Sequence, residues 1–414
     1  MTKPILVVPT HATMKQFASD GNQLLIGGLP ISRLAERVGQ TPFYAYDRDL
    51  LLSRVAELRA VLPDSIELHF AMKANPMPAL VGFMAGLVDG IDVASAGELK
   101  VALDAGANPS DISFAGPGKR NSELRQAVAA GVLINIESFR EVDILAELSQ
   151  ELELAARVAV RVNPDFELKG SGMKMGGGPK QFGVDAELVP ELLAKIGEKK
   201  LKFEGFHLFA GSQNLKPESI CEAQQKSYDL ALMLSRHAPL PVRFLNLGGG
   251  FGIPYFPGEK RLDLAPIGEN LKQLSHRAKK DFPEASLVIE LGRYLVGEAG
   301  IYVSRIVDRK ISRGHTFLIL DGGLNHHLSA SGNFGQVIRK NYPVAIGNRM
   351  NLEQTETVTI VGPLCTPLDI LADRMTFSAS TLGDLVVVFQ SGAYGASASP
   401  QRFLGHPEVI EILI

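Results

Sequence analysis

A single lysine, Lys73, follows a run of residues that the sequence predicts to be a buried strand. The run, Ile66 to Met72, places the apolar residues Leu68, Phe70 and Met72 at alternate positions, which is the spacing of a strand. An enclosed lysine has a lowered pKa, and its amine is then a nucleophile suited to forming a Schiff base. The alternative is a lysine that extends from the strand end into solvent.

Three consecutive glycines, Gly248 to Gly250, follow a later predicted strand. Glycines in this position allow backbone N–H groups to converge on an anion, and barrels of alternating strands and helices often bind phosphate after strands seven and eight. The hydroxyl of Ser212 could donate a hydrogen bond to the same phosphate. The alternative is an ordinary flexible turn.

The next predicted strand ends in a carboxylate and an arginine, Glu290 and Arg293. A carboxylate at this place could hold a protonated ring nitrogen, and the guanidinium could face a phosphate or a carboxylate. The alternative is a simple ion pair at a strand end.

Further chemistry-bearing residues occur near the C-terminus. Cys365, beside Gly-Pro, is either a small buried residue or an acid that returns a proton to a carbanion. Tyr394 lies between glycines and could donate to phosphate. His326 and His327 are adjacent, so that in a strand their side chains would diverge, and no further ligands follow at metal-binding spacing; we therefore predict no metal site.

Strands and helices must alternate to position these residues. Eight apolar runs with helical segments between them predict a parallel sheet, and their span of about 250 residues favours a closed (β/α)8 TIM barrel, which places chemistry at the C-terminal strand ends. The runs are Ile66–Met72, Gly90–Ala94, Ile112–Ala115, Val132–Ile136, Arg157–Val162, Phe203–Phe209, Arg243–Leu247 and Ser286–Ile289.

After residue 298 the predicted elements are mainly strands, at Ile301–Val307, Thr316–Leu320, Thr357–Val361, Asp384–Phe389 and Val409–Leu413. The sequence therefore predicts an α/β barrel over residues 38–297. A second, mainly β domain, resembling a β-barrel or sandwich, is predicted from residues 1–37 and 298–414. We expect the glycine-dense stretch Gly170 to Gly183 to form a mobile loop over the barrel mouth.

Composition narrows the classes of function. The net charge of -3 gives no reason to expect nucleic acid or membrane binding, and no apolar stretch is long enough to cross a bilayer. Only two cysteines occur, Cys221 and Cys365, so a disulfide framework is not expected. We predict a cytoplasmic protein.

Together these motifs resemble the fold-type III pyridoxal-phosphate decarboxylases, the family of diaminopimelate and ornithine decarboxylases, from about Thr41 to Leu413. The resemblance implies pyridoxal 5'-phosphate as cofactor, Lys73 as the Schiff-base lysine and Glu290 as the partner of the pyridinium nitrogen. It implies a head-to-tail homodimer with shared active sites, in which Cys365 comes from the second subunit. The other cofactor contacts it implies are Asp92 and Arg161 near the ring, and Ser212, Gly248, Gly249, Gly250, Gly292, Arg293 and Tyr394 around the phosphate.

The departures from that family concern the ring and the substrate. Phe209 stands where the family has a ring-stacking histidine, and Leu291 replaces a proline of the Glu-Pro-Gly-Arg motif. Thr366 replaces the glutamate that contacts the distal end of diaminopimelate, and Ser329 lies near the place of an expected arginine. A site without those two charges should hold that distal end poorly.

Other motifs resemble a subgroup that contains glutamyl-[acyl-carrier-protein] decarboxylases and decarboxylases found beside exosortase systems. These motifs are Lys174-Met175-Gly176-Gly177, Asn325-His326-His327, Gly362 to Pro367 and Phe403-Leu404-Gly405-His406-Pro407. The resemblance implies an amino acid with a masked distal end, for example a carrier-protein thioester. We expect His326, Thr366 and Ser329 to contact it.

Three alternatives remain open from the sequence. The first is a decarboxylase of free diaminopimelate or another basic amino acid. The second is an amino-acid racemase, although Glu290 favours decarboxylation because racemases of this fold usually place an arginine at the ring nitrogen. The third is an inactive homologue that binds a partner.

Overall fold

The computed structural model describes residues 10–167, 170, 172–174, 176–336 and 338–414. It divides into two compact units. Of the described residues, the β unit contains Thr10–Leu51, together with Ile253–Arg261 and Val296–Ile414. The barrel unit contains Leu52–Gly252 and Leu262–Leu295.

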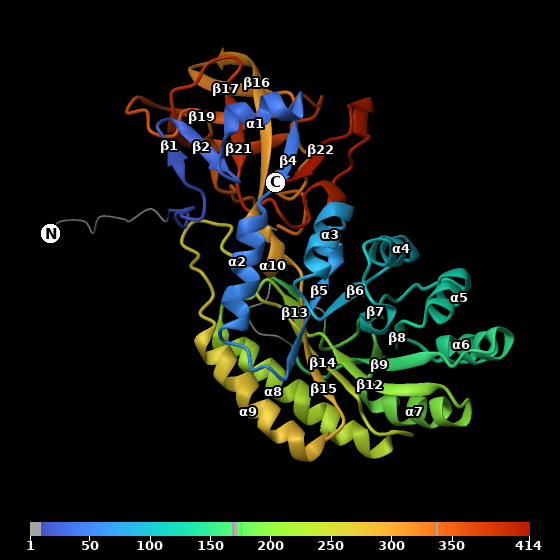
Figure 1. Cartoon of the computed structure of the whole chain (residues 1–414). Coiled ribbons are helices and arrows are strands. Elements are labelled where there is room, and N and C mark those ends of the chain that lie inside the picture. Colours follow the sequence, from blue (N-terminus) through green and yellow to red (C-terminus); the bar gives the residue numbers. More distant parts are fainter. Residues whose placement is uncertain (1–9, 168–169, 171, 175, 337) are drawn as a thin grey trace. The chain divides into compact units, whose positions relative to one another are not determined.

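The barrel unit is a closed parallel barrel, as the sequence predicts (Figure 1). Each of its eight strands pairs in parallel with the next, β8 pairs with β9, and β15 pairs with β5 to close the ring. The strands are β5 (Ile66–Ala71), β6 (Gly90–Val93), β7 (Ile112–Phe114), β8 (Leu133–Ile136), β9 (Arg157–Asn163), β12 (Lys202–Leu208), β14 (Phe244–Gly249) and β15 (Ser286–Leu291).

Alternation along the strands separates an apolar outer layer from a polar interior. On β5, Leu68 and Phe70 are fully buried, and His69 between them is also buried. Successive side chains of a strand point to opposite faces, so His69 lies on the face opposite these two apolar side chains. Buried polar residues also interrupt β8, at Asn135, and β12, at His207.

Helices follow the strands closely, and serine caps fix where two of them begin. The Ser95 hydroxyl accepts a hydrogen bond from the Glu98 N–H at 3.1 Å, and Ser138 caps the next-but-one helix in the same way. These short connections bring the strand ends and helix starts together. The helices of the unit are α3 (Pro78–Ala85), α4 (Ala96–Asp104), α5 (Asn121–Ala130), α6 (Phe139–Leu152), α7 (Val189–Glu198), α8 (Pro217–Leu234) and α9 (Ala265–Asp281). Boundaries between the two units fall within α2 (Arg48–Arg59) and within α10 (Arg293–Val296).

The β unit is built on one sheet of eight strands. Its order is β18-β21-β16-β17-β19-β20, and β4 pairs with both β16 and β22. A small sheet and one helix pack beside it in a core that includes Leu24, Ile31, Phe43 and Val303. The strands are β4 (Phe43–Tyr46), β16 (Gly300–Ser312), β17 (His315–Leu320), β18 (Val344–Ile346), β19 (Thr355–Val361), β20 (Ile370–Ser378), β21 (Leu385–Val388) and β22 (Ile410–Leu413), with β1 (Ser19–Asp20), β2 (Gln23–Ile26), β3 (Leu29–Pro30) and α1 (Ile31–Val38) beside them.

The five strand runs expected after residue 298 are present, whereas β18 and β20 were not predicted. The domain boundaries drawn from the sequence, at residues 38 and 297, stay a prediction. In the structure, β4 pairs with β16 over Phe43 to Tyr46, which places these residues in the sheet of the β unit. Within the described part of the chain, no helix combines the length and apolar character needed to cross a membrane.

Candidate active site

Lys73 lies in a short 3-10 turn, Met72–Ala74, directly after β5. Its ammonium Nζ is 3.7 Å from the Glu290 carboxylate oxygen Oε1 on the neighbouring strand β15. The carboxylate side chain is only 5% exposed, whereas the lysine side chain is 40% exposed. The amine is therefore less enclosed by the chain than the sequence predicts, and it lies beside a buried carboxylate.

A histidine that was given no role from the sequence contacts the same carboxylate. His207 Nε2 donates a hydrogen bond to the second Glu290 oxygen at 3.0 Å, and both side chains are buried. Burial alone would raise the pKa of Glu290, but the Lys73 charge and the His207 hydrogen bond outweigh it and hold that pKa well below its usual range. Glu290 is therefore an ionised carboxylate with fixed geometry.

The Phe209 ring supplies a flat apolar face near the amine. Lys73 Nζ lies 5.4 Å from the ring centroid, within the range of a cation–π contact. Three residues further, Ser212 belongs to β13 (Gly211–Ser212), which pairs with β10 (Met173–Lys174). Phe209 and Ser212 thus follow the barrel strand β12 in close succession.

The glycines after β14 are required by close backbone packing. A Cβ on Gly249 would lie 2.0 Å from the Glu290 carbonyl oxygen, and one on Gly248, whose φ is +72°, would lie 2.6 Å from the Leu208 carbonyl oxygen. A Cβ on Gly292 would come within 2.9 Å of the Ala71 carbonyl oxygen. Only glycine allows this close approach of the strand ends.

Arg161, on β9, is held by a buried carboxylate from the residue that follows the neighbouring strand β8. Its Nη1 donates a hydrogen bond to Glu137 Oε1 at 2.9 Å. Burial would raise the pKa of Glu137, but Arg161 and Lys119 outweigh it and lower that pKa. Glu137 also accepts the backbone N–H groups of Gly116 and Gly183, so its position, and that of Arg161, is fixed from several sides.

Asp92, on β6, is buried beside His69. One of its oxygens, Oδ1, lies 3.2 Å from His69 Nδ1. The other, Oδ2, is buried and has no hydrogen-bond partner within the described ranges.

Gly250 and Arg293, the first residue of α10, belong to the barrel unit. The other predicted residues lie in the β unit, where a buried carboxylate organises the loop that carries Cys365. The two Asp369 oxygens accept the N–H groups of Leu324, at 2.6 Å, and Leu364, at 2.9 Å. Cys365 itself is exposed and, like Cys221, is a free thiol. Asp369 thus ties the Cys365 loop to the loop that precedes His326.

The other three predicted substrate and phosphate residues also have partners within the β unit. The Ser329 hydroxyl donates to the Tyr394 carbonyl at 2.9 Å, and His326 Nε2 donates to the Pro407 carbonyl at 2.7 Å. The Thr366 hydroxyl accepts the Leu368 N–H at 3.4 Å.

Residues 48–297 match the family model described as "Pyridoxal-dependent decarboxylase, pyridoxal binding domain". The chain belongs to this family. It is a pyridoxal-phosphate-dependent decarboxylase, and the fold and cofactor implied by the resemblance are confirmed.

Relatives of this decarboxylase cover nearly its whole length. It is 40% identical over 389 residues to an L-glutamyl-[BtrI acyl-carrier protein] decarboxylase of Niallia circulans, a match that covers 92% of this chain and 90% of the relative. It is 32% identical over 401 residues to a diaminopimelate decarboxylase of Aquifex aeolicus, covering 95% and 90%. Among solved structures, a Helicobacter pylori diaminopimelate decarboxylase complexed with L-lysine superposes with a TM-score of 0.81 at 26% identity, covering 92% and 94%.

The barrel unit of this decarboxylase fits pyridoxal phosphate on its own contacts. An amine and an ionised carboxylate lie 3.7 Å apart. An aromatic ring centroid lies 5.4 Å from the amine, and the glycine turn belongs to β14, the strand beside β15. Asp92 Oδ2, His207 Nδ1 and Asn246 Nδ2 are among the buried polar atoms of the barrel that have no hydrogen-bond partner in the residues described. Buried polar atoms are normally paired, so these atoms are suited to contacts with a bound polar molecule.

Two predicted features fall only partly on described residues. Of the expected loop Gly170 to Gly183, Ser171 and Met175 lie outside them, and so does part of the Lys174-Met175-Gly176-Gly177 motif. In the described part of the chain, no group of three or more His, Cys, Asp or Glu side chains could hold a metal ion.

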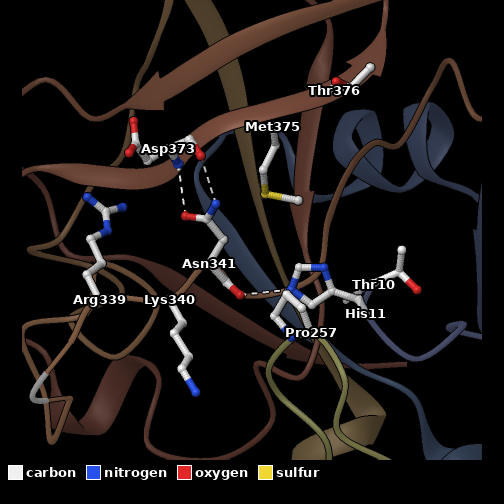
Figure 2. A pocket seen from close by; sticks show the side chains of 9 residues that line it. All are labelled: Thr10, His11, Pro257, Arg339, Lys340, Asn341, Asp373, Met375 and Thr376. Carbon is white, nitrogen blue, oxygen red and sulfur yellow. Dashed lines mark hydrogen bonds between the residues drawn. The ribbon is translucent and has the colours of Figure 1, made fainter. Parts of the chain in front are cut away.

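A cavity of about 820 Å³ in the β unit is separate from the predicted site (Figure 2). Asn341 forms two hydrogen bonds to the Asp373 backbone in its wall, and His11 Nε2 donates to the Asn341 carbonyl at 2.8 Å. None of the predicted site residues lines it; its lining is Thr10, His11, Pro257, Arg339, Lys340, Asn341, Asp373, Met375 and Thr376.

Proposed function

We propose that this decarboxylase removes the α-carboxyl group of an amino acid whose distal end is masked, such as a glutamyl group held as a thioester on an acyl-carrier protein. The observation that carries the catalytic assignment is the Lys73 amine 3.7 Å from a buried, ionised Glu290. The relative that is 40% identical acts, by its name, on a glutamyl carrier protein.

Each proposed residue has one task at the reacting centre. When bound, the cofactor supplies an electron sink for the pair left as CO₂ departs. Lys73 would hold the cofactor aldehyde covalently, and Glu290 would keep the ring nitrogen protonated. The Phe209 ring would pack against the cofactor face. The Cys365 thiol would return one proton to the α-carbon, from the second subunit of a head-to-tail homodimer.

The substrate proposal rests on the absence of charged side chains at two positions expected to recognise the distal end of the substrate. The two positions where diaminopimelate decarboxylases of the family are expected to recognise the distal end are occupied by Thr366 and Ser329. Both hydroxyls already bond to backbone groups, those of Leu368 and Tyr394. Neither residue can form an ion pair with a distal ammonium or carboxylate, so a neutral, masked end fits better. We further propose that the protein is cytoplasmic.

A comparison of substrates tests this proposal. CO₂ release is measured with glutamyl carrier-protein thioester, free glutamate, ornithine, lysine and diaminopimelate, each at equal concentration. We expect the carrier-bound substrate to give the highest kcat/KM. A preference for free diaminopimelate, the substrate of the Aquifex relative, would overturn the substrate proposal but not the assignment of Lys73.

Lys73→Ala tests the catalytic assignment separately. Because the side-chain amine is lost, we expect no cofactor to be fixed to the chain by borohydride and no CO₂ release. Lys119→Ala is the matched control for reactivity, since Lys119 is a buried barrel lysine paired with Glu141 at 3.0 Å. Peptide mapping of the borohydride-treated protein should locate the label at residue 73; a label elsewhere would refute the assignment.

A further inference from the structure

The barrel interior contains a histidine–carboxylate pair that no feature of the proposed mechanism uses directly. His69 on β5 and Asp92 on β6 are both buried, with side-chain exposures of 4% and 7%. His69 Nδ1 lies 3.2 Å from Asp92 Oδ1. In register, Asp92 pairs with Ala71, two residues before Lys73.

The sequence makes room for this imidazole at one particular glycine. His69 is in register with Gly90 on the adjacent strand. A Cβ at Gly90 would lie 2.4 Å from His69 Nε2, so any larger residue would displace the ring. The histidine side chain therefore occupies space that the neighbouring strand leaves free.

Only one oxygen of Asp92 is used by this pair. His69 holds Oδ1, whereas Oδ2 is buried and has no partner in the described chain. A carboxylate that is fixed at one oxygen presents the other in a defined direction. From this geometry we infer that His69 is a positioning residue, which orients the Asp92 carboxylate so that its free oxygen accepts a hydrogen bond from the bound cofactor or substrate. The inference rests on the proposed placement of Asp92 in the cofactor site.

His69 also borders a small cavity. This cavity has a volume of about 220 Å³ and is also lined by Glu67, whose Oε2 lies 3.9 Å from His69 Nε2. Burial lowers the pKa of His69, but Asp92, Glu67 and Glu290 outweigh it and raise that pKa. The other charged residues that line the cavity are Asp111, Arg157, Glu204 and Arg243.

The pair can be tested without reference to turnover. The full-length protein, selectively labelled at histidine, is titrated by NMR with the cofactor bound. We expect His69 to titrate above the ordinary range of histidine and to move downward in Asp92→Asn, because the carboxylate charge that stabilises the imidazolium is lost. A His69 resonance that Asp92→Asn leaves unchanged would overturn the inference.

Steady-state kinetics then test whether the orientation of Asp92 by His69 affects decarboxylation. His69→Phe should lower kcat/KM about 10-fold to 100-fold, the cost of a misplaced group, and change the pH dependence of the cofactor absorption. His69→Asn retains a donor near Nδ1 and should recover most of this loss; His276→Phe, at an exposed site on α9, is the control. The double variant His69→Phe, Asp92→Asn should be no worse than Asp92→Asn alone.

The positioning role would be contradicted if the losses in kcat/KM of the two single variants multiplied in the double variant. It would also be contradicted if His69→Phe were as active as the unmodified protein. If borohydride labelling showed that Lys73 does not carry the cofactor, the proposed function would fail. The NMR coupling between His69 and Asp92 would still be measurable, so that the two failures are distinguishable.

Discussion

The Glu290 carboxylate combines burial with a low pKa, and two contacts explain why it does so. Desolvation opposes its charge, but the Lys73 ammonium at 3.7 Å and the His207 hydrogen bond at 3.0 Å favour it more strongly. Because the pKa in the folded protein is depressed, this charge contributes stability above the unfolded pKa of about 4.3. That contribution is lost only as the pH falls through the folded value.

Glu290→Gln keeps the size of this side chain and removes its charge. We expect kcat for CO₂ release to fall about 10²-fold to 10³-fold, the magnitude typical of a lost electrostatic partner at a reacting centre. The loss should persist from pH 5 upward, since a glutamine does not titrate. Glu204→Gln, at a buried carboxylate that Arg157 contacts at 3.2 Å, is the matched control. Unchanged kcat in Glu290→Gln would exclude this carboxylate from the chemistry.

At the scale of elements, the turn after β14 joins two barrel strands through backbone contact. The register between β14 and β15 shifts between Asn246 and Gly249, where Gly249 pairs with Glu290. The backbone carbonyl of Glu290 lies where a Gly249 side chain would be. The backbone position of Glu290, and with it the position of its carboxylate, therefore requires glycine at residue 249.

Gly249→Ala should therefore disturb both the barrel and the site. We expect the free energy of unfolding to fall by about 1–3 kcal/mol, the usual cost of overpacking, and cofactor affinity to fall with it. Thermal unfolding and cofactor titration measure the two effects. Gly118→Ala is the control, because a Cβ there meets no atom within 4 Å. Equal behaviour of the two variants would mean that the turn is looser than its geometry indicates.

The sequence was sufficient for elements with regular apolar spacing and insufficient where that spacing is interrupted. All eight barrel strands could be predicted because their outward side chains, such as Leu68 and Phe70, are apolar. β20 was missed, since Arg374 within it has a φ of +47° and breaks the alternation. His69 and His207 were given no role, because a polar residue facing a barrel interior has the same spacing as one facing solvent.

At the scale of the whole molecule, the β unit contains a buried histidine that links its stability to pH. His327 is fully buried; its Nε2 donates to the Ser391 hydroxyl at 2.9 Å, and its Nδ1 accepts the Ala330 N–H at 3.3 Å. Burial lowers its pKa to about 3. Since an unfolded histidine titrates near 6.5, protons bind the unfolded chain preferentially below that pH.

Stability from a neutral His327 should thus be complete above about pH 6.5 and decline by up to about 1.4 kcal/mol per pH unit as the pH falls toward 3. His327→Gln cannot take up this proton, so its loss of stability between pH 7.5 and 5.5 should be smaller. Denaturant unfolding at the two pH values measures the difference, with the exposed His237→Gln as control. An identical decline in all three proteins would rule out His327 as the group responsible.

The pairing of β4 also dictates an order of events during synthesis. β4 ends at Tyr46, yet its two partners are β16, which begins at Gly300, and β22, which ends at Leu413. As the chain leaves the ribosome, every barrel strand emerges before either partner does. We expect the barrel to form first, while β4 stays unpaired until β16 is translated and gains its second partner only with β22.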